Sequence, residues 1–281
     1  MAVINTNISA LRASNASVAA DKMLGSAMER LSTGKRINSA KDDAAGLAIA
    51  TSMTSQTRGM AQGIRNANDG ISLAQTAEGA LSKVGDSLQR MRELAIQARN
   101  ATNSSSDKDS LNKEFVELQK EIARVLGGTT FNGKHILGAD ATTLTFQIGA
   151  NTTADDVINI NTSNMVTDTT ITDITSTTMA AIDANATVGA IGDVIDNLDK
   201  AIDLVNDTRA TYGATQSRFD AIISNLQTAV ENQSAARSRI MDADYAAETA
   251  NMSRAQILQQ AGTAMVAQAN QLPQQVLKLL G

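Results

Sequence analysis

The chain contains no cysteine and no tryptophan among its 281 residues. Without thiols, neither a disulfide framework nor a thiolate metal site can form. This composition suits a reducing cytosol, and it equally suits an exported protein that must stay unlinked in transit. Aromatic residues make up only 2% of the chain. We therefore expect thin helical packing by Leu, Ile, Val, Met and Ala rather than a thick core filled with rings.

Proline, positive charge and long apolar runs are also scarce. The one proline, Pro273, favours long uninterrupted helices, because an interior proline costs about 3 kcal/mol. The net charge of −5 provides no basic footprint, so we expect no nucleic-acid partner. No run approaches about 18 consecutive apolar residues. The first residues lack the basic start and apolar core of a cleavable signal peptide. We predict neither membrane insertion nor a cleaved signal.

Catalytic and metal-binding patterns fail at their decisive positions. The only histidine is His135, which excludes zinc proteases with two histidines and leaves no further histidine for a triad. Gly128–Lys134 has most of a phosphate-binding loop, but His135 stands where the magnesium-binding hydroxyl belongs. Asp242 and Asp244 begin like a calcium loop that lacks its glycine. We predict no catalytic residue, no cofactor and no metal, and therefore no enzyme.

Both ends of the chain carry one apolar stripe at helical spacing. In the last stretch the stripe comprises Leu258, Ala261, Met265, Ala269, Leu272, Val276 and Leu279. In the first stretch it comprises Ile4, Ile8, Leu11 and Val18. A narrow stripe on a terminal helix cannot be buried alone. The two helices therefore bury each other, or they are buried in neighbouring copies of the chain, and we expect the stripes to direct subunit assembly.

Long helices are predicted between these ends. One begins near Ile4 and ends near Leu31, and another follows Asp42 and Asp43 and continues to about Asn100. The second contains several glycines, each of which weakens a helix by about 1 kcal/mol relative to Ala, so packing must offset them. These are Gly59, Gly63, Gly70, Gly79 and Gly85. A third helix carries the 111–125 pattern, with a capping box expected at Ser106 and Asp109.

The centre of the chain changes period. Residues 144–148 alternate apolar and polar side chains, and the β-branched run Val157–Ile160 follows after a turn, which predicts short strands or hairpins. Residues 161–178 contain eight Thr among eighteen residues, and the stretch between Lys134 and Lys200 has nine Asp and no basic residue. We expect a solvated outer face or loop here. The 195–230 heptads then predict the strongest helix, with Arg209 and Gln216 as polar interruptions.

Four long blocks of the sequence are distinctive. They are ERLSTGKRINSAKDDAAGL at 29–47, RNANDGISLAQTAEGAL at 65–81, LQRMRELAIQ at 88–97, and SRIMDADYAAETANMSRAQILQQAGTAMVAQANQLPQQVLKLL at 238–280. These blocks resemble bacterial flagellin. The resemblance covers about residues 1–135 and 190–281. It implies a mainly α fold: a long helical hairpin or coiled-coil bundle, built from paired N- and C-terminal segments, with a small β-hairpin region.

The resemblance also implies an organisation and a function. Residues 1–43 with 238–281 correspond to the inner terminal-helix domain, and 44–237 to the outer-tube domain, with 129–190 as its β-hairpin and variable surface segment. The chain is then a structural subunit of the extracellular flagellar filament, exported unfolded and self-assembling into a helical tube that serves as a propeller. Expected partners are other copies of the chain, an export chaperone, the cap, hook–filament junction proteins and host pattern-recognition receptors.

The resemblance also assigns a surface for subunit packing and receptor binding, and two alternative functions of the protein stay open. The block at 88–97 matches a flagellin surface used both in subunit packing and by an animal receptor, through Leu88, Gln89, Arg90, Glu93, Leu94 and Gln97. Candidate O-glycosylation residues in the Thr-rich segment are Ser163, Thr170, Thr175, Ser176 and Thr177. The alternatives are a hook–filament junction protein, against which the intact 65–97 run argues, and a secreted coiled-coil effector or adhesin.

Overall fold

The computed structural model describes residues 6–176 and 180–280, with side chains described as far as Gln271. The chain divides into two compact units. Unit 1 joins residues 1–55 with 231–281, and unit 2 comprises 56–230. The helices are α1 (Ile8–Thr33), α2 (Ala44–Ala98), α3 (Ser105–Gly128), α4 (Thr169–Thr175), α5 (Val188–Met241) and α6 (Tyr245–Leu280). The predicted mainly α fold with paired terminal segments is confirmed.

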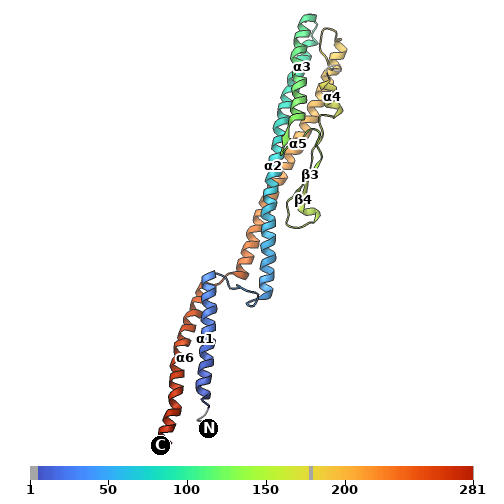
Figure 1. Cartoon of the computed structure of the whole chain (residues 1–281). Helices are drawn as coiled ribbons and strands as arrows, with labels where there is room; N and C mark the ends of the chain where they lie inside the picture. The colour runs from blue at the N-terminus through green and yellow to red at the C-terminus, as the bar shows by residue number, and fades with distance from the viewer. Residues whose placement is uncertain (1–5, 177–179, 281) are drawn as a thin grey trace. The chain divides into compact units, whose positions relative to one another are not determined.

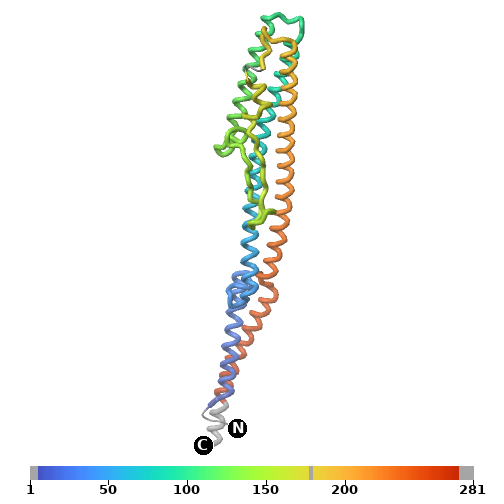
Figure 2. The backbone as a smooth tube through the Cα atoms, turned by 90° about the vertical axis from the view of Figure 1, so that its right-hand side faces the viewer, coloured from blue at the N-terminus to red at the C-terminus, as the bar shows by residue number. Residues whose placement is uncertain are grey.

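Within unit 2, α2, α3 and α5 lie side by side (Figures 1 and 2). Their shared core follows the predicted heptads, because residues seven apart return to one face of a supercoiled helix. Leu81 and Leu88 of α2, Phe115 of α3, and Leu198 and Val205 of α5 are all completely buried. Mostly aliphatic side chains thus hold the three helices together, as predicted, although the rings of Phe115, Tyr212 and Phe219 are buried among them.

Three glycines of α2 allow the β-hairpin region and the ring of Phe219 of α5 to pack closely against the helix. A Cβ added at Gly59 would lie 2.7 Å from the Cβ of Ala150, and one at Gly63 would lie 2.6 Å from the carbonyl carbon of Ile148. One at Gly70 would lie 2.6 Å from the ring of Phe219. The backbone after β3 therefore packs directly on the helix. This contact offsets the low helix propensity of these glycines.

The β-region consists of two small antiparallel ladders. Strands β3 (Thr143–Gln147) and β4 (Val157–Asn161) pair with Phe146 opposite Ile158, as their alternation predicted. Strands β1 (Thr130–Phe131) and β2 (Lys134–His135) flank a two-residue turn. In that turn Asn132 and Gly133 have φ of 49° and 78°. Positive φ at both positions is what a tight hairpin requires.

The N-cap of helix α3 lies two residues before the predicted cap. The capping box joins Ser104 and Asp107, not Ser106 and Asp109. Hydrogen bonds from the hydroxyl and the backbone N–H of Ser104 hold the pKa of Asp107 below its usual value. Asp109 instead accepts a hydrogen bond from the backbone N–H of Ala184 at 2.9 Å. Both Ser-x-x-Asp offsets satisfy the sequence pattern, so the pattern alone could not select the cap.

The Thr-rich segment is not simply a solvated loop. It forms α4, whose Ile171 and Ile174 are buried in the core of unit 2. The buried Gln119 of α3 donates from Nε2 to the carbonyl oxygens of Ile174 and Ala180, at 2.8 and 3.0 Å. The expectation of an outer loop is wrong for these residues, because two isoleucines three apart can bury one face of even a short helix.

Candidate assembly surface

The terminal helices α1 and α6 pair through small residues. Ala20 and Ala27 of α1 and Ala255 of α6 are at most 2% exposed, and Ala269 is 6% exposed. These alanines stand at heptad spacing along a seam between the two helices, and small side chains at such a seam let helix backbones approach closely. Among the residues of α1 and α6 whose side chains are described, no large apolar side chain is fully buried between the two helices.

Of the described members of the predicted apolar stripes, Ala269 lies in this seam and the large side chains are about half-exposed. Ile8 is 49% exposed, Leu11 59% and Val18 49%, while Leu258 is 46% and Met265 61% exposed. Ala261 is exposed as well. Of the two alternatives that the sequence left open, mutual burial within the chain does not occur for these residues. Their surface is free for another molecule.

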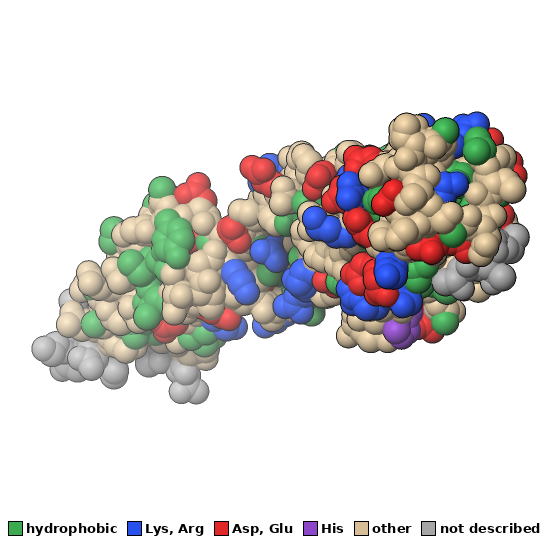
Figure 3. All heavy atoms as spheres, turned by 90° about the horizontal axis from the view of Figure 1, so that it is seen from above, with side chains coloured by type: hydrophobic (Ala, Val, Ile, Leu, Met, Phe, Trp, Pro, Cys, Tyr) green, Lys and Arg blue, Asp and Glu red, His purple; other side chains and the backbone are tan. Residues whose placement is uncertain are grey.

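Other members of the predicted stripes lie outside the described residues. Ile4 belongs to the undescribed start of the chain, while Leu272, Val276 and Leu279 lie in α6 at positions whose side chains are not described. Sequence reasoning missed further exposed apolar residues of the same helices, namely Met23, Met28 and Ile257. Figure 3 shows hydrophobic side chains gathered on the surface of unit 1. This exposed apolar surface of α1 and α6 is called the terminal stripe below.

Polar contacts fix α1 and α6 in register. Near the start of α1, Asn7 donates from Nδ2 to the carbonyl oxygen of Ala269 at 2.8 Å. Near its end, Arg30 forms an ion pair of 2.9 Å with Glu248, whose side chain is only 10% exposed. A buried carboxylate requires such a partner, because burial of an isolated charge is costly. Both ends of the pair are therefore tied by side chains from opposite ends of the sequence.

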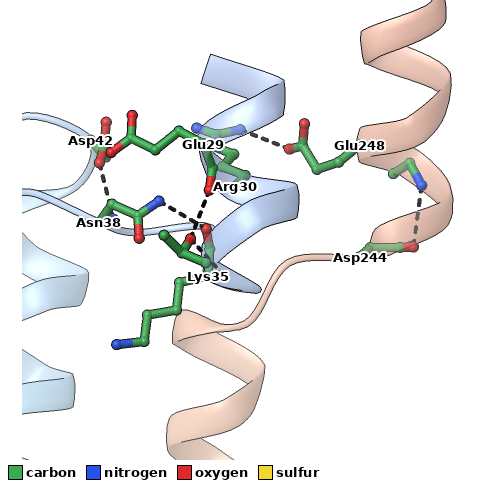
Figure 4. A network of polar contacts seen from close by, with 9 residues as sticks. Glu29, Arg30, Lys35, Asn38, Asp42, Asp244 and Glu248 are labelled. Atoms are coloured by element: carbon green, nitrogen blue, oxygen red, sulfur yellow. Dashed lines mark hydrogen bonds and ion pairs between the residues drawn. The ribbon is translucent and has the colours of Figure 1, made fainter. Parts of the chain in front are cut away.

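A polar network supports the turn after α1 (Figure 4). Asp42 accepts hydrogen bonds from the backbone N–H groups of Ser39 and Asn38, and these bonds hold its pKa below the usual value. Asp244 caps α6 by accepting from the N–H groups of Ala246 and Ala247. The acidic pair that began like a calcium loop thus serves, at Asp244, to start a helix.

The predicted surface at 88–97 separates into exposed and buried residues. Gln89, Arg90, Glu93 and Gln97 are exposed on α2. Leu88 and Leu94 are completely buried in the core of unit 2, so they are not surface residues. The reason is the helical period, which turns residues 88, 91, 94 and 95 toward α3 and α5 while their neighbours face outward.

Arg90 is held between two carboxylates. Its Nε donates to Glu114 of α3 at 2.8 Å, and its Nη1 donates to Glu93 at 3.0 Å. These hydrogen bonds, that with Glu114 foremost, raise the pKa of Arg90 above its ordinary value. Sequence reasoning missed Glu114 because it lies on another helix, and no local spacing relates it to residue 90.

The glycosylation candidates differ in accessibility. Ser163 is exposed, whereas Thr170, Thr175 and Ser176 are half-buried. The hydroxyl of Thr175 donates to the carbonyl oxygen of Ile171 at 2.9 Å. Thr177 lies outside the described residues. Glycosylation stays a prediction, with Ser163 as its most accessible position.

Metal and membrane sites are not found in the described part of the chain. No group of three or more His, Asp or Glu side chains within residues 6–176 and 180–280 is arranged to hold a metal ion. None of the described helices combines the length and hydropathy of a membrane span. The features that stand out are surfaces: an unburied apolar stripe and a charged helix face.

This combination defines a helical structural subunit that associates with other copies of itself. Family models described as the bacterial flagellin N-terminal helical region and the bacterial flagellin C-terminal helical region match residues 4–142 and 195–280. The chain belongs to the bacterial flagellin family.

Individual relatives agree with this assignment. The chain is 45% identical to a flagellin of Xenorhabdus nematophila over 99% of each chain. It is 46% identical to a flagellin of Halalkalibacterium halodurans over 90% of each. Among solved structures, it is similar to Bacillus cereus flagellin with 32% identity and a TM-score of 0.48, over 58% of this chain and 88% of that one.

The chain is therefore a structural subunit of the extracellular bacterial flagellar filament, and the predicted function and location are confirmed. Self-association into a filament, the first of the predicted partnerships, follows from the family. Neither alternative, the hook–filament junction protein or the secreted effector, has better support. The family is one of structural proteins, and the absence of catalysis stays a prediction.

Proposed function

We propose that the terminal stripe is the surface through which each subunit is buried against its neighbours, so that residues 1–43 with 238–281 form the inner tube of the filament. One observation carries the proposal: large apolar side chains lie half-exposed on a helix pair whose own seam is filled by alanine. Burial of the exposed half of each such side chain stabilises by about 0.8–1.5 kcal/mol. That free energy becomes available only when subunits assemble.

In this proposal the rest of the chain, 44–237, forms the outer tube, and its 129–190 segment covers the outer surface. The role is mechanical rather than catalytic, and the chain works as part of a rotating propeller. A cysteine-free chain suits export in an unfolded state, since no crosslink can form on the way. An export chaperone, the cap and the hook–filament junction proteins are the partners proposed for delivery and assembly.

Methionine oxidation offers a direct test of burial by neighbours. Met265 is 61% exposed and Met28 is 55% exposed, so both should oxidise readily in the monomer. In seeded filaments we expect their oxidation by dilute peroxide to fall at least about tenfold, because neighbours exclude solvent from them. Mass spectrometry of peptides measures this change. Met91, which is completely buried, should resist in both states; equal oxidation of Met265 in both would refute the proposal.

We also propose that the exposed face at Gln89, Arg90, Glu93 and Gln97 binds a neighbouring subunit in the filament and a host pattern-recognition receptor in the soluble protein. Arg90 is the proposed centre of this face. Its guanidinium is held by Glu93 and Glu114 and yet remains half-exposed. A preorganised planar donor loses little entropy on binding, and arginines of this kind are common at energetic centres of interfaces.

Arg90→Ala should weaken both interactions while leaving the subunit folded. Exposed ion pairs contribute only about 0–1 kcal/mol to stability, so thermal unfolding should hardly change. Loss of an interface centre costs about 2 kcal/mol or more, which is roughly a 30-fold loss of affinity. Receptor signalling by the soluble protein and swimming by cells that carry the variant would be measured.

Lys83→Ala is the matched control for Arg90. Lys83 is another basic residue of α2, its side chain is 77% exposed, and it pairs only with Asp86 within its own helix. This variant should keep full signalling and swimming. If Arg90→Ala behaves like Lys83→Ala in both measurements, the face around Arg90 has neither role.

A further inference from the structure

The core between α2 and α5 repeats every seven residues without interruption. On α5 the repeating positions are Ile191, Leu198, Val205, Tyr212 and Phe219, each at most 1% exposed. On α2 they are Ala67, Ala74, Leu81, Leu88 and Ala95, each completely buried. A slide of one helix past the other by seven residues would again place apolar positions opposite apolar ones. The buried core alone therefore does not select one register.

A second stripe beside this core is interrupted by polar residues on both helices. On α5 it runs Ile195, Ile202, Arg209, Gln216, Ile223 and Val230. On α2 it runs Ile64, Ile71, Glu78, Gly85 and Arg92. All of these residues are half-buried. The polar positions occupy the middle of the α5 stripe, with isoleucines on either side.

Both polar residues of the α2 stripe find partners on α5. Arg92 pairs with Asp199, where both side chains are more than 40% exposed and the ion pair therefore contributes little. Glu78 meets the two polar positions of the α5 stripe. Gln216 donates from Nε2 to Oε2 of Glu78 at 3.2 Å, and Nη2 of Arg209 lies 3.9 Å from Oε1 of the same carboxylate. Arg209 and Gln216 are seven residues apart and occupy the same position in two successive heptads. The carboxylate of Glu78 lies between them. One carboxylate thus contacts both polar positions of α5.

Neighbouring contacts define the same antiparallel alignment. Phe219 packs against Gly70 on one side of Glu78, and Val205 packs against Gly85 on the other. These two contacts tolerate a slide by seven residues. Gly70 would then receive Tyr212 or Leu226, and Gly85 would receive Leu198 or Tyr212, which are large side chains in every case. Their shapes discriminate little between registers.

The polar contact does discriminate. A slide by seven residues in one direction would place Ile202 where Arg209 now meets Glu78, and a slide in the other direction would place Ile223 where Gln216 does. In each case the carboxylate keeps one polar partner and faces an isoleucine instead of the other. Loss of a partner from a half-buried carboxylate is penalised, whereas exchange of one apolar side chain for another is not.

We propose that Glu78, together with Arg209 and Gln216, is the register lock of unit 2: it selects one alignment of α2 and α5 from those that the heptads permit. The lock is not built for maximal stability. The Nε of Arg209 and the hydroxyl of Tyr212, on adjacent turns of α5, are buried without hydrogen-bond partners. A polar layer that costs stability and specifies alignment is an established use of such residues in coiled coils.

The lock ensures that every subunit has the same length. Seven residues of helix span about 10 Å, at a rise of about 1.5 Å per residue. A mixture of registers would give subunits whose helices end at different heights. A regular filament cannot incorporate such a mixture.

Spin labels on the full-length chain test the lock, and the absence of cysteine makes their attachment specific. Labels would be attached through Gln75→Cys on α2 and Asp193→Cys on α5, two exposed positions. Pulsed electron resonance should give one distance for the parent chain. In the triple variant Glu78→Leu, Arg209→Leu and Gln216→Leu we expect further populations shifted by about 10 Å. A single unshifted population in that variant would overturn the proposal.

Two further variants keep the test decisive if the triple variant does not fold. The charge exchange Glu78→Arg with Arg209→Glu retains a polar layer, so one unshifted population is expected. Glu78→Arg alone places two guanidinium groups together and should give shifted populations. A single unshifted population for Glu78→Arg alone, or shifted populations for the charge exchange, would also refute the lock.

Discussion

Replacement of Leu258 and Met265 by Asp in one chain should abolish filament formation without unfolding the subunit. The two side chains are 46% and 61% exposed, so the isolated subunit loses little when they change. In the filament they would be buried against neighbours. About half of each side chain is already buried in the isolated subunit, so each lost burial costs about 0.8–1.5 kcal/mol, half of the value for full burial. Together the two substitutions should raise the critical concentration for assembly by a factor of about 10 to 10².

Seeded assembly followed by sedimentation and electron microscopy measures this effect, and circular dichroism reports the fold of the subunit. Thr263→Asp is the matched control, because it adds a charge to an exposed position of α6 on a different side of the helix from Ile257, Leu258 and Met265. Normal filaments from the double variant would show that the terminal stripe is not an assembly surface. Failure of the control alone would point to charge on α6 rather than to loss of apolar burial.

Two glycines of α2 should respond to the same substitution with opposite signs. Gly63→Ala would place a Cβ against the carbonyl group of Ile148, a backbone group that cannot rotate away. The strand end must shift, and overpacking of this kind costs about 1–3 kcal/mol or more. Gly79→Ala meets nothing within 4 Å and should stabilise the subunit by about 1 kcal/mol through helix propensity alone.

Chemical unfolding of the two variants separates these expectations, and hydrogen exchange locates the change. In Gly63→Ala the amides of β3 and β4 should lose protection first, because Asn66 also anchors this ladder through the carbonyl oxygen of Gln147 at 2.7 Å. Gly79→Ala should leave them unchanged. If both variants shift the free energy of unfolding in the same direction, close packing of the hairpin against Gly63 does not contribute to the stability of the subunit.

The long-period features of the fold could be predicted from sequence, because they depend on spacing alone. Heptads between 195 and 230 predicted the body of α5, and alternation at 144–148 predicted β3. Local patterns were less decisive. Two Ser-x-x-Asp pairs competed for the start of α3, and backbone geometry at Ser104 selected between them. Ile171 and Ile174 were hidden by the threonines around them, although their spacing already fitted a short helix.

The residues of the assembly surface could be predicted from the sequence, but their orientation could not. The large apolar residues of the stripes were found, but the side they face was not, because the predicted stripe grouped Ala269 with the large residues and did not include Ala255 and Gly262. The signal was present: Ala255, Gly262 and Ala269 recur every seven residues and mark the seam. The partnership of Arg90 with Glu114 could not be predicted. It depends on how α3 packs against α2, which no local spacing records.

The discontinuity of unit 1 has a consequence for the order in which the chain folds. Its two helices come from opposite ends of the sequence, and in an unfolded chain their meeting would close a loop of nearly the whole protein. The entropy lost on closing a loop grows by about 0.6 kcal/mol for each doubling of its length. Once residues 56–230 have folded, that loop is already closed, and the hydrogen bond between Arg237 and Thr54 shows how near its ends then lie. We therefore expect α1 and α6 to pair last during folding and to separate first during unfolding. The helices proposed to make the contacts in the filament are then also the last to fold.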